Sequence, residues 1–521
     1  MRTWPTVALA MLFAVALMLP SPASAQTVAN AVKQDTSPAL SSIPAPPPRA
    51  QAAFVKEHRV KRLPPLPPAA QAAVTDTTMQ KKAPAKLPIG PIDAIEGIGE
   101  GLSGFNVNSF PADTTGAAGT TQYVQWVNTS FAVFDKTTKK SVLGPIDGSI
   151  LWKGFGGNCE HFNDGDPIVL FDRIDNRWIL SQFAIETPPF SQCVAVSTTA
   201  DATGPYHRYE FQYKDFNDYG KLGIWPDAYY ATYNMFGAGD AFLGAQACAF
   251  ERAKMLAGQP ARMVCFDVAS QGGLLPSDLD GTTPPPAGAP NYVMNFGRNR
   301  LNLWKFKVDW GNPSGSSLTG PTQITTAPFT EACATAPSPG TCIPQPKTTV
   351  KLDSLGDRLM YRLGYRNSGD HQALTVNHSV AVGSGAGIRW YEVRDPDGTP
   401  KIQQQGTYAP TTTSRWMGSI ASDKAGNFAI GYTASDASVS PSIRVIGRSK
   451  GDPLNKLSAE TTVAAATGKG SQKKFTRWGD YSTLTLDPTD DCSFWYTAQY
   501  QKDSTHDWHT KILHFKFNSC Q

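Results

Sequence analysis

The sequence predicts an all-β protein, and three observations support this fold class. From Phe105 onward, turns rich in Gly, Pro, Asn and Asp separate runs of about 6 to 9 residues in which apolar and polar residues alternate. The apolar positions are mostly Val, Ile, Tyr, Phe and Trp, and almost no stretch has a helical period. Groups of four such runs recur along the chain, which indicates a repeat of antiparallel sheets.

The repeat has a pitch of about 60 residues, which is typical of the four-stranded blades of a β-propeller. Residues 357–409, for example, divide into DRLMYRLGY, HQALTVNHSV, GIRWYEVR and IQQQGTYA. The markers of successive first strands are Tyr123, Ile168, Tyr229, Val293, Leu359, Met417 and Ser482. Seven markers predict seven four-stranded blades. Six or eight blades also fit, because the unit that follows LNLWKFKVD is poorly defined.

The last unit offers only three clear strands, YSTLTLD, SFWYTAQY and HTKILHFKF. A three-stranded blade would leave an unpaired edge, and such edges are normally covered. We therefore expect an N-terminal strand between Ile92 and Phe110 to close the ring, with FNVNSF as the candidate. On this hypothesis, deleting residues 91–110 unfolds the protein, whereas deleting residues 26–85 does not.

The first 25 residues have the pattern of a signal peptide. Arg2 precedes the apolar run VALAMLFAVALML, and Ala23-Ser24-Ala25 forms a small-residue cleavage site. The run is shorter than the roughly 20 residues of a membrane-spanning helix, so a retained anchor is the weaker alternative. The mature chain is expected to begin near Gln26 and to be secreted or periplasmic.

Residues 26–90 contain 11 prolines and almost no aromatic residue. Such a composition cannot bury enough apolar surface to order a chain, so it predicts a disordered tether or a cleaved leader. The segment has 9 basic and 3 acidic residues, and it either contacts anionic envelope polymers or is a solvated linker. Residues 91–521 are then expected to form a single propeller domain.

The predicted domain has 37 basic and 40 acidic residues. This balance lacks the basic footprint of a nucleic-acid-binding protein. We expect a monomer with no nucleic-acid partner and, after cleavage, no membrane span.

Eight cysteines in an exported chain favour disulfides over metal ligation, and none forms a Cys-x-x-Cys pair. About 105 pairings exist for eight cysteines, and we favour the local set. In this set, two pairs join neighbouring strands of one unit, one closes a Pro-rich loop, and the last two cysteines pair with each other. The expected pairs are Cys248–Cys265, Cys492–Cys520, Cys333–Cys342 and Cys159–Cys193.

Residues that precede the first strands of a propeller converge on one rim of its central channel. Carboxylates accept hydrogen bonds from hydroxyls, Arg clamps acidic groups and Trp stacks on sugar rings, so such residues can line a binding funnel. The alternative for each aspartate is to accept hydrogen bonds within a turn. The candidates are Asp166, Trp225, Asp227, Asn291, Asp357, Arg415, Trp416, Arg477, Trp478, Asp480 and Tyr481.

The four Arg-Trp pairs divide into two sets. Arg177-Trp178 and Arg389-Trp390 lie inside later strands, where the Trp is expected to pack between blades and the Arg to cover it. Arg415-Trp416 and Arg477-Trp478 precede or begin first strands, so both binding and packing stay open for them.

The funnel suggests three functions. The first is recognition of a glycan, or of an envelope or extracellular protein. The second is a carbohydrate-active hydrolase or lyase, which needs two carboxyl groups about 5 to 9.5 Å apart. The third is a structural surface protein without a ligand.

For the enzyme hypothesis, the candidate carboxylates are Asp166, Asp227, Asp357 and Asp480. His371 and His378 are candidate proton carriers that Tyr481 could assist, although strand histidines more often make structural hydrogen bonds. The sequence contains no G-x-S-x-G, P-loop or H-E-x-x-H motif, and the catalytic residues stay unknown.

Two acidic stretches, residues 163–166 (NDGD) and 487–491 (DPTDD), are dense in the hard oxygen ligands that calcium prefers. Neither matches a complete calcium loop, and turn formation is the alternative. Apart from structural calcium, no cofactor is predicted.

Several long stretches resemble an uncharacterised family of secreted bacterial β-propeller proteins. The resemblance covers most of residues 100–521, implies a secreted propeller and assigns no catalytic residue. It rests on NDGDPIVLFDRIDNRWILSQFA, GIWPDAYYATYN, DRLMYRLGYRNSGDHQALTVNHSV, RWMGSIASDKAGNFAIGY and RWGDYSTLTLDPTDDCSFWYTAQY.

A looser similarity is to sialidase-type propellers, and it implies that Arg362, Arg415 and Arg477 clamp a carboxylate. That family repeats the turn Ser-x-Asp-x-Gly-x-x-Trp. The nearest stretch here, residues 422–428, has neither its spacing nor its Trp.

Overall fold

The computed structural model describes residues 25–44, 56–57, 61–66, 75–82, 84–503 and 507–521. The chain is nearly all β, with 48% of its residues in strands and 6% in helices. Among the described residues, the short helical segments are α2 (Asn158–His161), α3 (Arg252–Leu256) and the 3-10 turns η1 (Leu40–Ser42), η2 (Gly148–Trp152), η3 (Ala238–Asp240), η4 (Pro313–Gly315) and η5 (Ala464–Ala466).

The first three large sheets are antiparallel and follow one another along the chain. The first contains β7 (Thr114–Ala118), β8 (Gln122–Val127), β9 (Ser130–Asp135) and β10 (Ser141–Asp147). The second contains β11 (Ile168–Asp172), β12 (Arg177–Ala184), β13 (Phe190–Ser197), β14 (Tyr206–Tyr213) and, at its outer edge, β2 (Lys33–Thr36). The third contains β15 (Phe216–Ile224), β16 (Tyr229–Phe236), β17 (Phe242–Phe250), β18 (Arg262–Val268) and the edge strand β1 (Gln26–Asn30).

The next two groups of strands join into one nine-stranded sheet through a parallel pair, β19 and β25. One half contains β19 (Leu275–Asp280), β20 (Asn291–Gly297), β21 (Arg300–Lys307) and β22 (Ser317–Thr325). The other half contains β25 (Met360–Asn367), β26 (Gln372–Val382), β27 (Gly385–Arg394), β28 (Lys401–Tyr408) and β4 (Met79–Gln80).

Two further four-stranded sheets complete the chain. They consist of β29 (Ser414–Ser422), β30 (Phe428–Ser435), β31 (Ser442–Arg448) and β32 (Thr461–Thr462), and of β33 (Thr483–Leu486), β34 (Ser493–Tyr500), β35 (His509–Lys516) and β5 (Asp93–Glu96). Two small pairs are β23 (Thr341–Ile343) with β24 (Leu352–Asp353), and β3 (Lys56–Glu57) with β6 (Ser109–Phe110).

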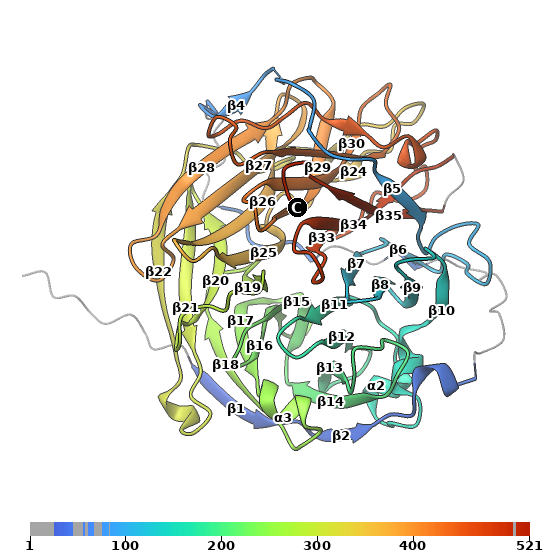
Figure 1. The fold of residues 1–521 in the computed structure, drawn as a ribbon, viewed down its shortest axis with the longest axis vertical. Helices are drawn as coiled ribbons and strands as arrows, with labels where there is room; N and C mark the ends of the chain where they lie inside the picture. The colour runs from blue at the N-terminus through green and yellow to red at the C-terminus, as the bar shows by residue number, and fades with distance from the viewer. Residues whose placement is uncertain (1–24, 45–55, 58–60, 67–74, 83, 504–506) are drawn as a thin grey trace, which may run out of the picture.

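The large sheets surround a common centre, the arrangement of a β-propeller (Figure 1). One strand of each group lies innermost and contacts the innermost strands of its two neighbours. In order around the centre, these strands are β7, β11, β15, β19, β25, β29 and β33.

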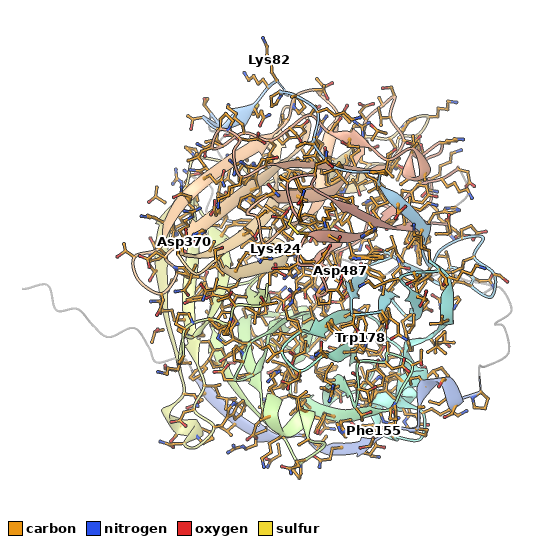
Figure 2. The ribbon with its side chains drawn as sticks, in the orientation of Figure 1. Lys82, Phe155, Trp178, Asp370, Lys424 and Asp487 are labelled. Carbon is orange, nitrogen blue, oxygen red and sulfur yellow. A yellow bond between two sulfur atoms is a disulfide. The ribbon has the colours of Figure 1, made fainter. Side chains whose placement is uncertain are left out.

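Large aromatic side chains fill the space between the sheets. Trp178 on β12 is fully buried (Figure 2), and its ring packs edge-on against Phe171 of the same sheet at a centroid distance of 4.8 Å. The ring also reaches the neighbouring sheet, where a Cβ atom on Gly119, between β7 and β8, would collide with it. Arg177 donates hydrogen bonds to the backbone oxygens of Asp175 and Asn176, and thus stabilises the turn before the strand. Trp178 therefore has the predicted packing role, whereas the contacts of Arg177 are with the turn and not with the Trp178 ring.

Three of the predicted first strands are second strands in the structure. Tyr123, Tyr229 and Val293 lie on β8, β16 and β20, whereas the innermost strands of these groups are β7, β15 and β19. The sequences of β7 and β15, TTGAA and FNDYGKLGI, lack regular apolar alternation, and so does LPSDLD of β19. Their buried positions include polar residues that face other innermost strands, so the alternation criterion missed them.

The prediction of a disordered tether is wrong for the described parts of residues 26–90. β1 pairs with β18, β2 pairs with β14 and β4 pairs with β28, so the segment follows the outside of three sheets (Figure 1). Added edge strands are held by backbone hydrogen bonds and need little apolar surface, which is why composition failed to reveal them. Residues 1–24, 45–55, 58–60, 67–74 and 83 lie outside the described residues, and the signal-peptide prediction falls on the first of these ranges.

The outer neighbour of β35 is β5, within the interval predicted to supply the last strand. The candidate FNVNSF was wrong, because its last two residues form β6, which pairs with β3. β5 is only four residues long, and Ile95 is its one buried residue, so its sequence gave little strand signal.

The four disulfides are the four predicted ones: Cys159–Cys193, Cys248–Cys265, Cys333–Cys342 and Cys492–Cys520. Such bonds are typical of proteins in oxidising compartments. No helix among the described residues is long and apolar enough to cross a membrane.

We predict that removing residues 26–44 exposes the outer edges of β14 and β18. Unpaired strand edges template association, so the truncated protein should form soluble oligomers and its Tm should fall by at least about 2 °C. Light scattering and thermal unfolding would measure both effects. A synthetic peptide of residues 26–44 added in trans should reverse them. An unchanged monomer with an unchanged Tm would show that the two strands contribute nothing.

Candidate functional site

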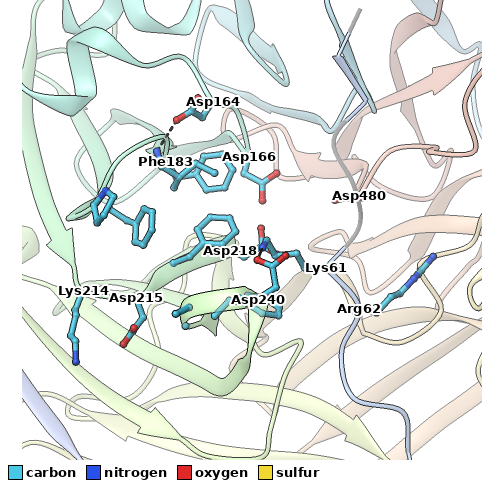
Figure 3. Close-up of a pocket in the computed structure, with 18 of the residues that line it drawn as sticks. Lys61, Arg62, Asp164, Asp166, Phe183, Lys214, Asp215, Asp218, Asp240 and Asp480 are labelled. Atoms are coloured by element: carbon cyan, nitrogen blue, oxygen red, sulfur yellow. Dashed lines mark hydrogen bonds and ion pairs between the residues drawn. The ribbon is translucent and has the colours of Figure 1, made fainter.

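A cavity of about 1000 Å³ opens at the centre of the molecule, at the end where several innermost strands begin. The loops that precede β7, β11, β25 and β33 contribute to its wall, together with the first residues of β15. Figure 3 shows Asp166, Asp218 and Asp480 in this cavity. The lining of the cavity includes Lys61 and Arg62 of the N-terminal segment, together with Asp113, Asn128, Asp166, Phe183, Phe190, Phe216, Asp218, Phe236, Asp240, Arg358, Arg477 and Asp480.

Three carboxylates meet in this cavity. Asp113, Asp166 and Asp480 each offer an oxygen that lies within 4.8 Å of the other two. They precede β7, β11 and β33, so neighbouring strand ends bring them together although they are distant in sequence. Asp113 and Asp166 both have a φ of 44°, a backbone conformation that non-glycine residues seldom adopt. Such strain is common at functional sites, where the surrounding structure maintains it.

Hydrogen bonds link the three loops. Asp113 accepts one from the backbone N–H of Asp480 at 2.8 Å and one from the side chain of Asn128, also at 2.8 Å. Arg477 forms a two-point ion pair with Asp480, with distances of 2.7 and 2.8 Å. The position of the Asp480 carboxylate is therefore fixed from two sides.

Positive charges lie beside the carboxylates. The Nζ atom of Lys221, on β15, is 3.6 Å from the ring centre of Tyr219 and 4.0 Å from that of Tyr481. Lys221 is completely buried. The Arg358 guanidinium lies 4.5 Å from the ring centre of Tyr219 and pairs with Asp357 at 2.8 Å. Cations over aromatic faces are held by the ring quadrupole as well as by the nearby carboxylates.

Burial and charge separate the pKa values of these carboxyl groups. Burial raises the pKa of Asp113 well above its ordinary value, and the charges of Asp480 and Asp166 act in the same direction. Burial, with the charge of Asp166, raises the pKa of Asp218 to about 7. For Asp480, burial also acts to raise the pKa, but Arg477, Arg358 and Lys221 outweigh it and the pKa is lowered.

Burial also lowers the pKa of Lys221 to about 8, although the neighbouring carboxylates oppose this shift. The raised pKa values of Asp113 and Asp218 favour their protonated forms, which can donate a hydrogen bond, whereas the lowered pKa of Asp480 favours the ionised form, which can only accept. Carboxyl groups with separated pKa values are also the usual basis of acid-base pairs.

An aromatic wall stands on one side of the cavity. Phe216 lies 6.0 Å from Phe183, 5.7 Å from Phe190 and 6.3 Å from Phe236, measured between ring centres. All four rings line the cavity. The site thus combines an apolar wall with a polar base.

The carboxylate cluster could hold a cation, but its surroundings do not favour one. Lys221, Arg358 and Arg477 already compensate its charge, and a divalent ion would be repelled by them. In residues 487–491, Asp487 accepts hydrogen bonds from Lys136, Thr489 and Trp495, as expected of a turn. Structural calcium stays a prediction.

The structure brings together three of the residues that the sequence singled out: Asp166, Arg477 and Asp480. Tyr481 lies directly behind them and donates a hydrogen bond to the backbone oxygen of Pro167. Asp357 holds Arg358, which lines the cavity.

Trp225, Asp227 and Asn291 do not line the cavity. All three precede or begin β16 and β20, which the sequence predicts to be innermost strands. The innermost strands of these groups are β15 and β19 instead. Trp225 packs edge-on against Tyr365 at 4.7 Å. Asp227 accepts a hydrogen bond from Tyr230, and Asn291 donates one to Ser277.

The remaining arginine and tryptophan candidates also have structural contacts outside the cavity. Trp416 packs against Trp478 at 6.0 Å. Arg415 pairs with Glu460, and Arg362 pairs with both Asp278 and Asp280. Arg389 pairs with Asp76 and donates a hydrogen bond to Thr407.

Neither candidate histidine belongs to the site. His378 is fully buried, with its Nε2 3.0 Å from the Tyr391 hydroxyl and its ring 4.7 Å from Phe329. His371 lies in the loop between β25 and β26 and pairs with the exposed Asp370. Both histidines therefore make structural contacts, which was the alternative to a role as proton carriers.

Sequence reasoning missed four residues of the charged network: Asp113, Asp218, Lys221 and Arg358. The first precedes β7, and the next two lie on β15, which are innermost strands that apolar alternation did not reveal. Arg358 directly follows Asp357 and also precedes β25, so the expectation that residues before first strands converge on the channel could have included it.

No family model matches the chain, and none of the curated proteins searched matches it. Several solved structures show a distant likeness. The N-terminal domain of Nup159 has 8% identity and a TM-score of 0.35, covering 84% of this chain and 99% of its own. An exo-β-1,3-galactanase from Clostridium thermocellum has 9% identity and a TM-score of 0.30, covering 82% and 99%. An endo-arabinase from Bacteroides thetaiotaomicron has 10% identity and a TM-score of 0.27, covering 57% and 93%. At these scores, the likeness carries no argument about this chain.

We predict that Asp218→Asn changes how stability depends on pH. The raised pKa of Asp218 favours its neutral form, so its contribution is complete below pH about 4 and is lost as the pH rises to about 7. The variant's unfolding free energy should therefore fall less between pH 4 and 7 than that of the wild type. Denaturant unfolding at several pH values would measure this.

Asp480→Asn is the contrasting variant, because the lowered pKa of Asp480 gives a contribution that is present above pH about 4 and lost below it. Its deficit against the wild type should therefore grow with rising pH. Identical pH slopes for the two variants would contradict the described electrostatics.

Proposed function

We propose that the protein is an exported, monomeric β-propeller of seven blades that binds a glycan in its central cavity. The observation that supports this most strongly is the meeting of Asp113, Asp166, Asp480 and Arg477 opposite a wall of phenylalanine rings. The blade count rests on the ring of innermost strands, and β5 is proposed to complete the last blade.

The polar base of the cavity suits a ligand that is rich in hydroxyl groups. A hydroxyl group both donates and accepts hydrogen bonds. A set of carboxyl groups in which some are protonated and others ionised offers partners for both roles. Asp480 is ionised and accepts, whereas Asp113, with its raised pKa, can donate. A purely anionic or purely apolar ligand would leave part of this set without a partner, which is costly in a buried site.

The aromatic wall suits the other surface of a sugar ring. The C–H groups on one face of a sugar are apolar and stack on aromatic rings. The rings of Phe183 and Phe216 lie in the same cavity as the carboxylates, so one ligand could contact both. The volume of about 1000 Å³ is at the upper end of small-ligand sites, which suits an oligosaccharide better than a single sugar.

Hydrolysis of a carbohydrate is the second candidate, and the separated pKa values favour it. Asp218, with a pKa of about 7, has the property of a general acid near neutral pH. Asp480 stays ionised, as a base or nucleophile does. The acid role is assigned to Asp218, because it lines the same cavity as Asp480 and its pKa is raised while that of Asp480 is lowered.

We predict that Asp166→Ala weakens glycan binding at least about tenfold, the effect of losing one charge-assisted hydrogen bond. None of the hydrogen bonds described above ends on the Asp166 side chain, so the fold should survive the change. A glycan array would identify a ligand, and calorimetry would measure its affinity for both proteins. His371→Gln, outside the cavity, is the matched control and should bind normally. Equal affinity of the Asp166 variant and the wild type would exclude the cavity as the binding site.

For the second candidate, we predict that the wild type releases reducing sugars from a polysaccharide that it binds. Asp218→Asn should then lower turnover at least about 100-fold and leave the affinity nearly unchanged, because the general acid acts in the transition state. Product analysis by chromatography measures the turnover. Saturable binding without any product would leave the binding function and exclude the hydrolase.

A further inference from the structure

The chain places one of its own lysines at the mouth of the cavity. Lys61 belongs to the N-terminal segment, and its ammonium group lies 4.7 Å from the ring centre of Phe216 and 5.2 Å from that of Phe236. It also pairs with Asp240, in η3 (Figure 3). Two aromatic faces and a carboxylate surround the cation, which is the composition of sites that recognise alkylammonium groups.

The residues that follow hold this segment in place. Arg62 pairs with Asp353, and the backbone N–H of Leu63 donates to Asp357 at 3.2 Å. Arg358, which lines the cavity, donates to the backbone oxygen of Lys61 at 3.2 Å. The segment is therefore anchored by contacts that do not involve the lysine side chain.

Glycines make room for these anchors. A Cβ atom on Gly272 would lie 2.6 Å from the side chain of Leu63, and one on Gly340 would meet the guanidinium of Arg62. Gly273, with a φ of +62°, also approaches Leu63. The chain therefore accommodates the segment in a defined position.

The lysine itself is held only weakly. Its side chain is 23% exposed, and that of Asp240 is 77% exposed. Ion pairs as exposed as this one contribute little to stability, because water screens them. A soluble cation of similar shape could replace Lys61 while the neighbouring anchors stay in place.

The charge around the mouth favours such a replacement. Without Lys61, the residues that line the cavity include seven aspartates and four basic residues, which are Arg62, Lys214, Arg358 and Arg477. Of the aspartates, Asp240 is the one that pairs with the Lys61 ammonium, and it is exposed at the mouth rather than part of the compensated cluster. The immediate surroundings of the Lys61 ammonium therefore attract a cation rather than an anion.

We propose that Phe216, Phe236 and Asp240 form a binding site for a protonated primary amine, and that Lys61 occupies it as an internal ligand. The ligand class is an alkylammonium group with a lysine-like apolar stem. This site shares Phe216 and Phe236 with the aromatic wall of the proposed glycan site, but it does not involve Asp113, Asp166 and Asp480, so amine binding is tested without a glycan.

The test is a titration of the full chain and its Lys61→Ala variant with n-butylammonium, followed by ligand-observed NMR. Lys61 competes for the site from within the chain, so removing it should raise the affinity for n-butylammonium, by about tenfold if the lysine fills the site nine-tenths of the time. Lys61→Met, which fills the cage with an uncharged side chain, should bind more weakly than Lys61→Ala. Lys82→Ala, on the outside of the molecule (Figure 2), is the matched control and should behave as the wild type.

Two further measurements separate this proposal from general apolar or electrostatic binding. Butan-1-ol has the same stem without the charge, and it should bind Lys61→Ala at least about tenfold more weakly than n-butylammonium does. Adding Asp240→Asn to Lys61→Ala should lower the n-butylammonium affinity again, and this exposed side chain can change without unfolding the protein. Equal affinity of the wild type and Lys61→Ala, or equal binding of the alcohol and the amine, would overturn the proposal.

Discussion

The arrangement of this protein depends on balancing charges where its innermost strands meet. Arg362, on β25, is completely buried and pairs with Asp278 and Asp280 of β19 at 2.6 Å. It also donates a hydrogen bond to the backbone oxygen of Leu484, on β33. One guanidinium thus joins three strands of three different groups. An unpaired charge at such a depth would be strongly destabilising, so the partners fix one another's positions.

The same balance explains the properties of the cavity. Asp480 has a full partner in Arg477 and its pKa is lowered, whereas Asp218 has no comparable ion pair among the described residues and its pKa rises to about 7. The difference arises from contacts rather than from residue type, since both side chains are aspartates. The ion pairs at the centre of the molecule therefore also determine which carboxyl group can donate a hydrogen bond and which can only accept one. The hydrogen-bonding properties of the cavity therefore depend on how the surrounding strands pack.

The sequence predicted those features that local patterns determine. Alternating residues identified most strands, the local cysteine pairs all form, and the loops before β11 and β33 supplied Asp166, Arg477 and Asp480. It could not predict β15 as an innermost strand, because Asp218 and Lys221 interrupt the apolar alternation. These residues are acceptable there only because distant strands provide their partners, and the sequence does not show which strands become neighbours. The edge strands β1 and β2 were not predicted for another reason. They are held by backbone hydrogen bonds, so their sequences need no pattern of apolar residues.

The N-terminal segment connects the outside of the molecule with its centre. β1 and β2 extend two sheets at their outer edges, β4 extends a third, and residues 61–63 lie between these strands in sequence and contact the cavity mouth. Because the backbone pairs at both ends involve other sheets, they do not depend on where the Lys61 side chain lies. The segment can therefore stay attached while that side chain leaves its aromatic contacts. The N-terminal segment is fixed by its paired edge strands, and the Lys61 side chain is held only weakly. A soluble amine can therefore replace this side chain without the loss of any strand pairing.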